Sequence, residues 1–172
     1  MNRRSRKGEV QPGKRTRWGP ARYARLTGAT LAAALALGAA AYDLDQHVWR
    51  DRLLFLIAPT PEDPLLQAQA RTIEQREAAL RDRDLRVFML YRESATVDDL
   101  DLSAREAEQL RRHLGVTEDN RLMILVGKDG GVKRRATLDT DLREIFLQID
   151  GMPMRRAEIR TKKAAGEQVT TP

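Results

Sequence analysis

Two adjacent carboxylates, Glu62 and Asp63, are the first residues along the chain whose types and spacing could perform chemistry. They follow the apolar run 52–58 and stand where a helix is expected to begin, so they could act as a general acid and a general base if burial separated their pKa values. The alternative is that both are exposed acids in the first turn of the helix, where they complement the helix dipole. We favour this second interpretation.

The chain contains no cysteine. Disulfide exchange and thiol peroxidation both need a thiolate, and no pKa shift can supply one without sulfur. Thiol redox activity is therefore excluded.

Two acidic groups could bind a metal ion. The run Asp98–Asp101 lacks the spacing and the distal Glu of a calcium loop, so we interpret it as a solvated acidic loop. Asp43, Asp45 and His47 alternate and could chelate a metal, but a zinc site is not expected from two histidines and no cysteine. We predict no metal site and no cofactor.

The most unusual segment is 150–160, Asp-Gly-Met-Pro-Met-Arg-Arg-Ala-Glu-Ile-Arg. Met152 and Met154, followed by Arg155 and Arg156, could form an adaptable apolar contact edged by groups that bind carboxylates or phosphates. The alternative is that the methionines cover the end of the core while the arginines lie in water or pair with acids of the same segment.

The elements that must position these residues follow a β-α-β-α-β-β-α order. Apolar runs predict strands, and apolar residues spaced i, i+3, i+4, i+7 predict helices. The expected strands span 53–58, 85–91, 122–126 and 132–136, and the expected helices span about 64–83, 103–114 and 142–149. A helix between two buried strands implies a parallel crossover. The order is that of thioredoxin-like domains, so we predict an α/β three-layer sandwich with a mixed central sheet, preceded by an N-terminal apolar helix.

In thioredoxin-like domains the redox cysteines lie at the junction after the first strand. Here that junction is 58–64, which ends a strand and begins a helix without any sulfur. The proline expected before the third strand is also absent, with Asn120 and Arg121 near that position. We therefore predict that the fold is retained and the redox function lost.

The positive charge of the chain lies in its N-terminal leader. Residues 1–25 hold nine Lys and Arg against one acid, whereas the remainder holds 22 basic and 24 acidic residues. A nucleic-acid-binding domain would carry the positive charge on its folded part, so nucleic acid is not an expected partner.

Residues 26–42 carry no charge and follow the basic leader, as in a signal peptide. Ala39–Ala41 offers small residues for cleavage, and an uncleaved N-terminal anchor is the alternative. Either topology exports the domain, which we place at 43–160, to the periplasm or the extracellular space. We expect the tail, 161–172, to be disordered.

Several segments together resemble an uncharacterised domain family, found in short exported bacterial proteins and, more distantly, in vertebrate extracellular proteins of the sushi-repeat and URB-equarin group. They are Trp49–Pro59, Pro59–Pro64, Ile124–Lys133 and Ile149–Glu158. The resemblance implies a peroxiredoxin-related, thioredoxin-like fold without redox cysteines and offers no catalytic residue. Residues that match its pattern, with Met154 added from the unusual segment, form a candidate binding surface: Asp63, Lys128, Asp129, Lys133, Asp150, Met154, Arg155, Arg156 and Glu158.

We therefore expect a non-catalytic thioredoxin-like module outside the cytoplasm that binds a protein or a small anionic ligand. One alternative is a cysteine-independent hydrolase or lyase that uses Glu62, Asp63 or the turn with Lys128, Asp129 and Lys133. Another is a structural envelope protein tethered to the membrane by residues 26–42.

Overall fold

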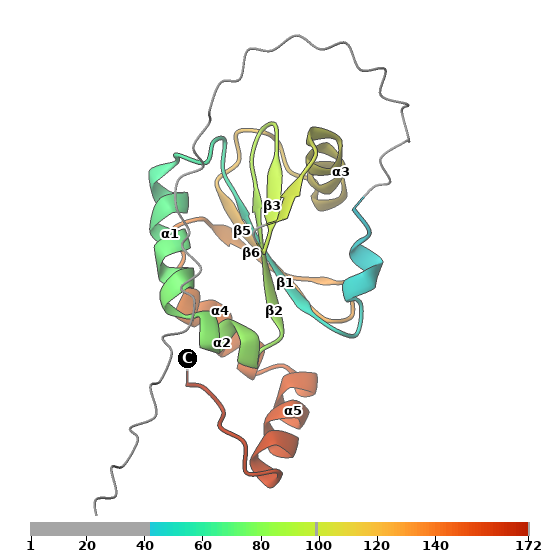
Figure 1. The fold of residues 1–172 in the computed structure, drawn as a ribbon, viewed down its shortest axis with the longest axis vertical. Helices are drawn as coiled ribbons and strands as arrows, with labels where there is room; N and C mark the ends of the chain where they lie inside the picture. The colour runs from blue at the N-terminus through green and yellow to red at the C-terminus, as the bar shows by residue number, and fades with distance from the viewer. Residues whose placement is uncertain (1–41, 99, 172) are drawn as a thin grey trace, which may run out of the picture. The chain divides into compact units, whose positions relative to one another are not determined.

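The first apolar run of the sequence forms a central strand of a mixed sheet in the computed structural model, which describes residues 42–98 and 100–171 (Figure 1). In chain order the elements of this part are η1 (Leu44–His47), β1 (Arg52–Ile57), α1 (Pro64–Gln75), α2 (Glu77–Asp82), β2 (Leu85–Leu90), β3 (Ala95–Val97), β4 (Leu100–Leu102), α3 (Ala104–Leu114), β5 (Leu122–Val126), β6 (Val132–Thr137), α4 (Leu142–Asp150) and α5 (Pro153–Ala164).

The six strands lie in the order β4-β3-β2-β1-β5-β6. β1 is parallel to β2, with Arg52 opposite Leu85 and Ile57 opposite Leu90, and it is antiparallel to β5. β5 and β6 form a hairpin. This arrangement confirms the predicted thioredoxin-like fold, since β1, the α1–α2 crossover, β2, α3, the β5–β6 hairpin and α4 follow the predicted order.

Alternate residues of β1 face two separate cores. Leu54 and Leu56 belong to the core that also contains apolar side chains of α1, α2 and α4, whereas Phe55 and Ile57 belong to the core beneath α3. All six residues of β1 are buried, because helices cover both faces of the sheet. The result is the expected three layers.

Local signals in the sequence set several helix ends. Ser103 and Glu106 form the predicted capping box at the start of α3, which ends at Gly115 in a left-handed conformation with φ of 61°. Asp63 caps α1, and Pro64 occupies its first position.

Three elements differ from the prediction. The helix expected over 64–83 is divided at Arg76 into α1 and α2. The acidic run, expected to be a loop, contributes to a β3–β4 hairpin that extends the sheet beyond β2. Pro153 begins α5, which was not predicted and which continues through Ala164 into the tail expected to be disordered.

Contacts with distant segments explain α5 and the tail. Arg155 of α5 bonds to Asp82 of α2, and the amide of Thr170 donates to the same carboxylate. These contacts join residues 73 and 88 positions apart, so local patterns could not reveal them. The predicted N-terminal apolar helix lies outside the described residues, and none of the helices among those residues has the length and apolar character needed to cross a membrane.

Candidate functional site

An ion pair occupies the junction where thioredoxin-like enzymes hold their cysteines. Asp63 accepts hydrogen bonds from the amides of Leu65 and Leu66 at 3.0 and 3.4 Å, and Arg121 Nε donates to its second oxygen at 2.7 Å. Asp63 is 5% exposed, so the expectation of an exposed first-turn acid is wrong for this residue, whereas Glu62 is exposed as expected.

The electrostatics of this junction do not suit acid catalysis. Burial would raise the pKa of Asp63, but the hydrogen bonds from Arg121 and the two amides outweigh it and hold the pKa below its ordinary value. A general acid needs the opposite shift. Asp63 caps a helix and holds Arg121 near the position of the missing proline.

A second cluster, which we call the arginine network, lies where α5 meets α2 and the starts of β1 and β2. It consists of Arg52, Arg83, Arg155, Lys128, Lys162, Asp82, Asp150 and Glu158. Its three arginines are among the largest completely buried side chains of the described residues. Buried charges are costly unless they are paired and hydrogen-bonded, so the pairing of each arginine decides what the network does.

Arg155 is held by acids of two helices. Its Nη2 donates to Asp82 Oδ2 at 2.5 Å, its Nη1 donates to the Asp82 carbonyl at 2.6 Å, and its Nε donates to Asp150 at 3.2 Å. Burial would raise the pKa of Asp82, but hydrogen bonds from Lys162, Arg155 and Thr170 lower it to about 2. Arg155 therefore fastens α5 to the end of α2.

Arg52 connects α5 to the sheet. Its two terminal nitrogens donate to the two oxygens of Glu158 at 3.2 and 3.0 Å, and Lys128 lies 2.9 Å from the same carboxylate. The bidentate geometry is the strong form of an arginine–carboxylate contact. Burial would raise the pKa of Glu158, but hydrogen bonds from Arg52 and Lys128 lower it below the ordinary value.

Arg83 follows the last residue of α2 and connects it to both the α4 end and the C-terminal tail. It donates to Asp150 at 2.5 Å and to the hydroxyl of Thr170 at 2.9 Å, and its guanidinium lies 4.6 Å from the ring centre of Phe146. It also donates to the carbonyl of Ala79, and cations are favourable at the negative end of a helix. The arginine network is therefore structural: it joins α5 to α2, α4 and the start of β1, and little of it is exposed to solvent.

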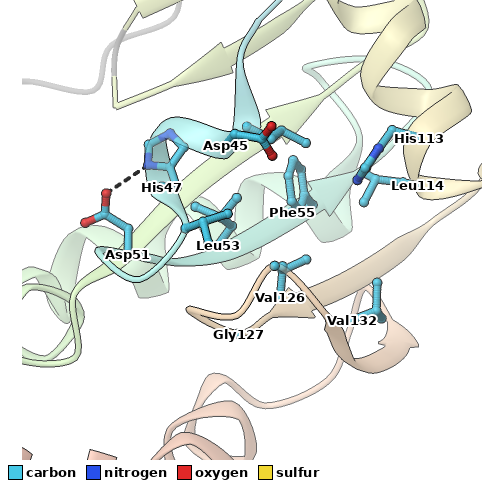
Figure 2. Close-up of a pocket in the computed structure, with 13 residues that line it drawn as sticks. Asp45, His47, Asp51, Leu53, Phe55, His113, Leu114, Val126, Gly127 and Val132 are labelled. Carbon is cyan, nitrogen blue, oxygen red and sulfur yellow. Dashed lines mark hydrogen bonds and ion pairs between the residues drawn. The ribbon is translucent and has the colours of Figure 1, made fainter. Parts of the chain in front are cut away.

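An apolar pocket of about 90 Å³ lies between η1, the start of β1, the end of α3 and the β5–β6 turn. Figure 2 shows Leu53, Phe55 and Val126 lining it, with Asp45 of η1 and His113 of α3 on either side of Phe55. Val132, at the start of β6, also lines it. This pocket lies at the opposite end of β1 from the junction that contains Asp63.

The acidic groups that were considered as metal ligands, and for which no metal site was predicted, make other contacts. His47 Nδ1 lies 2.8 Å from Asp51 Oδ2, its Nε2 lies 2.9 Å from the Tyr42 hydroxyl, and Asp43 caps η1. Asp98 pairs with Arg86 at 2.6 Å. Across the part of the chain that the structure describes, no three His, Asp or Glu side chains are placed to hold a metal ion.

Residues 43–158 match the domain of unknown function DUF4174. The chain belongs to the DUF4174 family. This membership confirms the predicted resemblance to a domain family of unknown function.

The DUF4174 chain is also similar to two curated vertebrate proteins. It is 29% identical over 111 residues to Sushi repeat-containing protein SRPX2 of Xenopus laevis. This match covers 62% of the present chain and 24% of the Xenopus protein. It is 27% identical over 140 residues to Coiled-coil domain-containing protein 80 of Danio rerio. This match covers 72% of the present chain and 16% of the Danio protein. The chain therefore spans a quarter or less of the length of these relatives.

Two solved structures are similar to the DUF4174 chain at 13% sequence identity and a TM-score of 0.49. The match to the mitochondrial 2-Cys peroxiredoxin from Plasmodium falciparum covers 74% of this chain and 86% of the peroxiredoxin chain. For the reduced 2-Cys peroxiredoxin of Plasmodium vivax both shares are 72%.

The nine residues predicted as a binding surface fall into separate groups in the DUF4174 domain. Lys128, Asp150, Arg155 and Glu158 meet in the arginine network. Asp63 lies at the junction with Arg121, and Asp129 pairs with Lys133 at 2.5 Å within the β5–β6 turn. Met154 and Arg156 are exposed on α5.

Sequence reasoning missed other members of the arginine network, namely Arg52, Arg83, Asp82 and Lys162. Arg52 directly precedes the apolar run 53–58, and a charged residue beside a completely buried run is the one signal that could have indicated it. Arg83 is separated from β2 by the exposed Asp84, so this signal does not extend to it. Asp82 and Lys162 have no such signal, because their surroundings in the sequence are typical of exposed helix.

Proposed function

We propose that the DUF4174 chain is a non-catalytic thioredoxin-like module that acts outside the cytoplasm and binds another protein. Trp49 carries this proposal: its side chain is 66% exposed although it belongs to the residue type that most often anchors protein interfaces. Its amide donates to the carbonyl of Lys128 at 2.6 Å, so it lies beside the β5–β6 turn.

The backbone holds Trp49 in an unusual position. Its φ is 65°, a region that bulky residues rarely adopt and that costs about 1 kcal/mol. Such strain persists where neighbouring contacts hold it, often at functional positions. Here the bond to Lys128 holds the backbone while the indole extends into solvent.

Further apolar surface adjoins Trp49. Val48 and Gly130 line the pocket described above, and Val132 is 47% exposed at its edge. We call Trp49, Val132, the turn 127–131 and this pocket the turn face. An exposed aromatic side chain beside an apolar pocket is the form that anchored protein interfaces take.

The turn face includes part of the predicted binding surface, since Lys128 and Asp129 belong to the turn and Lys133 follows it. A partner would therefore contact this side of the domain. Arg155 is completely buried and could not contact a ligand. The predicted alternative of a small anionic ligand has weaker support, because Lys133 is already paired with Asp129.

Export of the module follows from residues 1–42, which combine a basic leader with an uncharged apolar run. We expect the domain in the periplasmic or extracellular fraction of its native cells. Mass spectrometry of its first residue distinguishes a cleaved signal, with a start near Tyr42, from an uncleaved anchor. Recovery of the whole chain in the cytoplasm would contradict this part of the proposal.

Binding is tested by crosslinking the full chain in its native cells, identifying the attached protein and measuring its affinity for the purified chain. Trp49→Ala should weaken binding at least tenfold with an unchanged unfolding temperature, because it removes an exposed anchor. Leu100→Ala is the matched control, since Leu100 is an equally exposed apolar residue on β4. Equal affinities for Trp49→Ala, the control and the unaltered chain would overturn the proposal.

A further inference from the structure

The pocket of the turn face opens between η1 and α3 into a second, shallower hollow. The two hollows share Leu44, Asp45 and His113, and the shallower one is also lined by Gln109. Both parts are mainly apolar, and Asp45 and His113 bring polar groups to the place where the two parts meet, which we call the mouth. A ligand that fills both parts must therefore combine an apolar stem with a polar end.

The carboxylate of Asp45, which lines both hollows, receives no hydrogen bond from the described part of the chain. Asp45 is exposed, so only water solvates it in the free domain. A ligand that brings a charged donor to this opening would replace that water and form a hydrogen bond that is stronger than one between neutral groups.

The charges of the lining select the sign of the ligand. Asp43, Asp45 and Asp51 line the two hollows, whereas no Lys or Arg lines either of them. Asp51 already bonds to His47 and lies 3.7 Å from Arg86, which leaves Asp43 and Asp45 as the other acids of the lining. A cation is therefore favoured and an anion is disfavoured.

The size of the deep part limits the stem. A volume of about 90 Å³ holds several water-sized groups, which suits an unbranched chain of a few methylenes and excludes an aromatic cofactor. Lysine has such a stem, which packs along apolar surface and ends in an ammonium group with three donors.

We propose that this pocket binds the side chain of a lysine supplied by the protein partner, with its methylenes beside Leu44 and Phe55 and its ammonium group at the mouth near Asp45. This inference rests on the proposed function, because it names the residue through which the partner enters the turn face. No covalent step is involved.

The first experiment titrates the full chain with N-acetyl-lysine N-methylamide and follows amide shifts of residues around the pocket by NMR. The N-acetyl-norleucine analogue has a similar stem without the ammonium group and is the matched ligand. We expect the lysine compound to bind at least tenfold more tightly, because only it can neutralise Asp45. Equal binding of the two compounds, or shifts remote from the pocket, would overturn the inference.

The second experiment uses Asp45→Asn, which removes one charge while keeping the shape. Affinity for the lysine compound should fall about tenfold, which corresponds to about 1.4 kcal/mol. Asp139→Asn is the control, since Asp139 is exposed and does not line either hollow. An unchanged affinity in Asp45→Asn would also overturn the inference.

The two proposals fail in different ways. If Trp49→Ala abolishes partner binding while Asp45→Asn leaves it intact, the turn face binds a protein but the lysine assignment is wrong. If both substitutions leave partner binding intact while the lysine compound still binds the pocket, the pocket accepts free amines and the proposed function is wrong. Loss of partner binding in both variants, with the Asp139→Asn control intact, supports both proposals.

Discussion

Arg155 of α5 and Asp82 of α2 form an ion pair of 2.5 Å in which the two side chains are 0% and 8% exposed. The pair joins elements separated by 73 positions, and Lys162 and Thr170 bond to the same carboxylate. Segments that look like an exposed tail in the sequence are therefore fixed to the domain by buried charge.

Replacement of Arg155 should unfold the domain more readily than replacement of its neighbour. Arg155→Ala removes the guanidinium that joins Asp82 to Asp150 and leaves them only Lys162, Thr170 and Arg83 as partners, so we expect a loss of about 2–3 kcal/mol of unfolding free energy. Arg156→Ala is the matched control and should change it by less than about 0.5 kcal/mol, because Arg156 is exposed. Urea denaturation measures both. Equal small losses would show that the buried pair does not lock α5.

Acid should weaken the domain through Asp82. The pKa of Asp82 is lowered to about 2 in the folded state, while an unfolded chain has the ordinary value near 4, so the unfolded state binds the proton first as pH falls. Stability present above about pH 4 is therefore lost as pH falls toward 2, by about 2 kcal/mol from this group. The lowered pKa of Glu158 acts in the same direction.

Urea denaturation at pH 6, 4, 3 and 2 measures this loss. Asp82→Asn should be less stable at pH 6 and should lose less free energy between pH 4 and pH 2, because it lacks the titrating carboxylate. Identical losses in the variant and the unaltered chain would contradict the assignment to Asp82.

Replacement of Asp63, which caps α1 at the junction after β1, should lower the free energy of unfolding. Asp63→Ala removes the cap of α1 and leaves Arg121 without its partner, and we expect a loss of about 1–2 kcal/mol. Glu62→Ala should change the unfolding free energy by less than about 0.5 kcal/mol, since Glu62 is exposed. Thermal unfolding followed by circular dichroism compares the two. A larger effect from Glu62 would mean that the junction has another use.

The hydroxyl of Thr170 should hold the C-terminal tail in place. It donates to Asp82 at 3.0 Å and accepts from Arg83 at 2.9 Å. Thr170→Val should therefore lower the unfolding free energy by about 1 kcal/mol. It should also speed the amide hydrogen exchange of residues 166–170. Thr171→Val is the control, because Thr171 is exposed. Exchange rates that are the same in both variants would show that the tail is held by other contacts.

Local patterns were sufficient for most of the fold. The apolar run of β1, the capping box at Ser103 and the left-handed Gly115 each act within a few residues, so they predicted the element types correctly and the boundaries to within one residue. The same patterns failed at α5, because its one buried polar side chain, Arg155, is paired with acids of α2 and α4. Basic residues are usually exposed, so a tail was the natural prediction.

The sequence by itself determined the thioredoxin-like order of elements, because apolar periodicity and helix caps are local properties, and it contains no cysteine for thiol chemistry. Segments such as Ile149–Glu158 indicated the family by resemblance. Only the tertiary structure decided which charged residues are buried. Arg52 and Glu158, which are 106 positions apart, bond to each other because the fold brings the start of β1 beneath α5. It likewise decided that Asp45 of η1, Phe55 of β1 and His113 of α3 line one pocket, since three separate elements have to pack together before that surface exists.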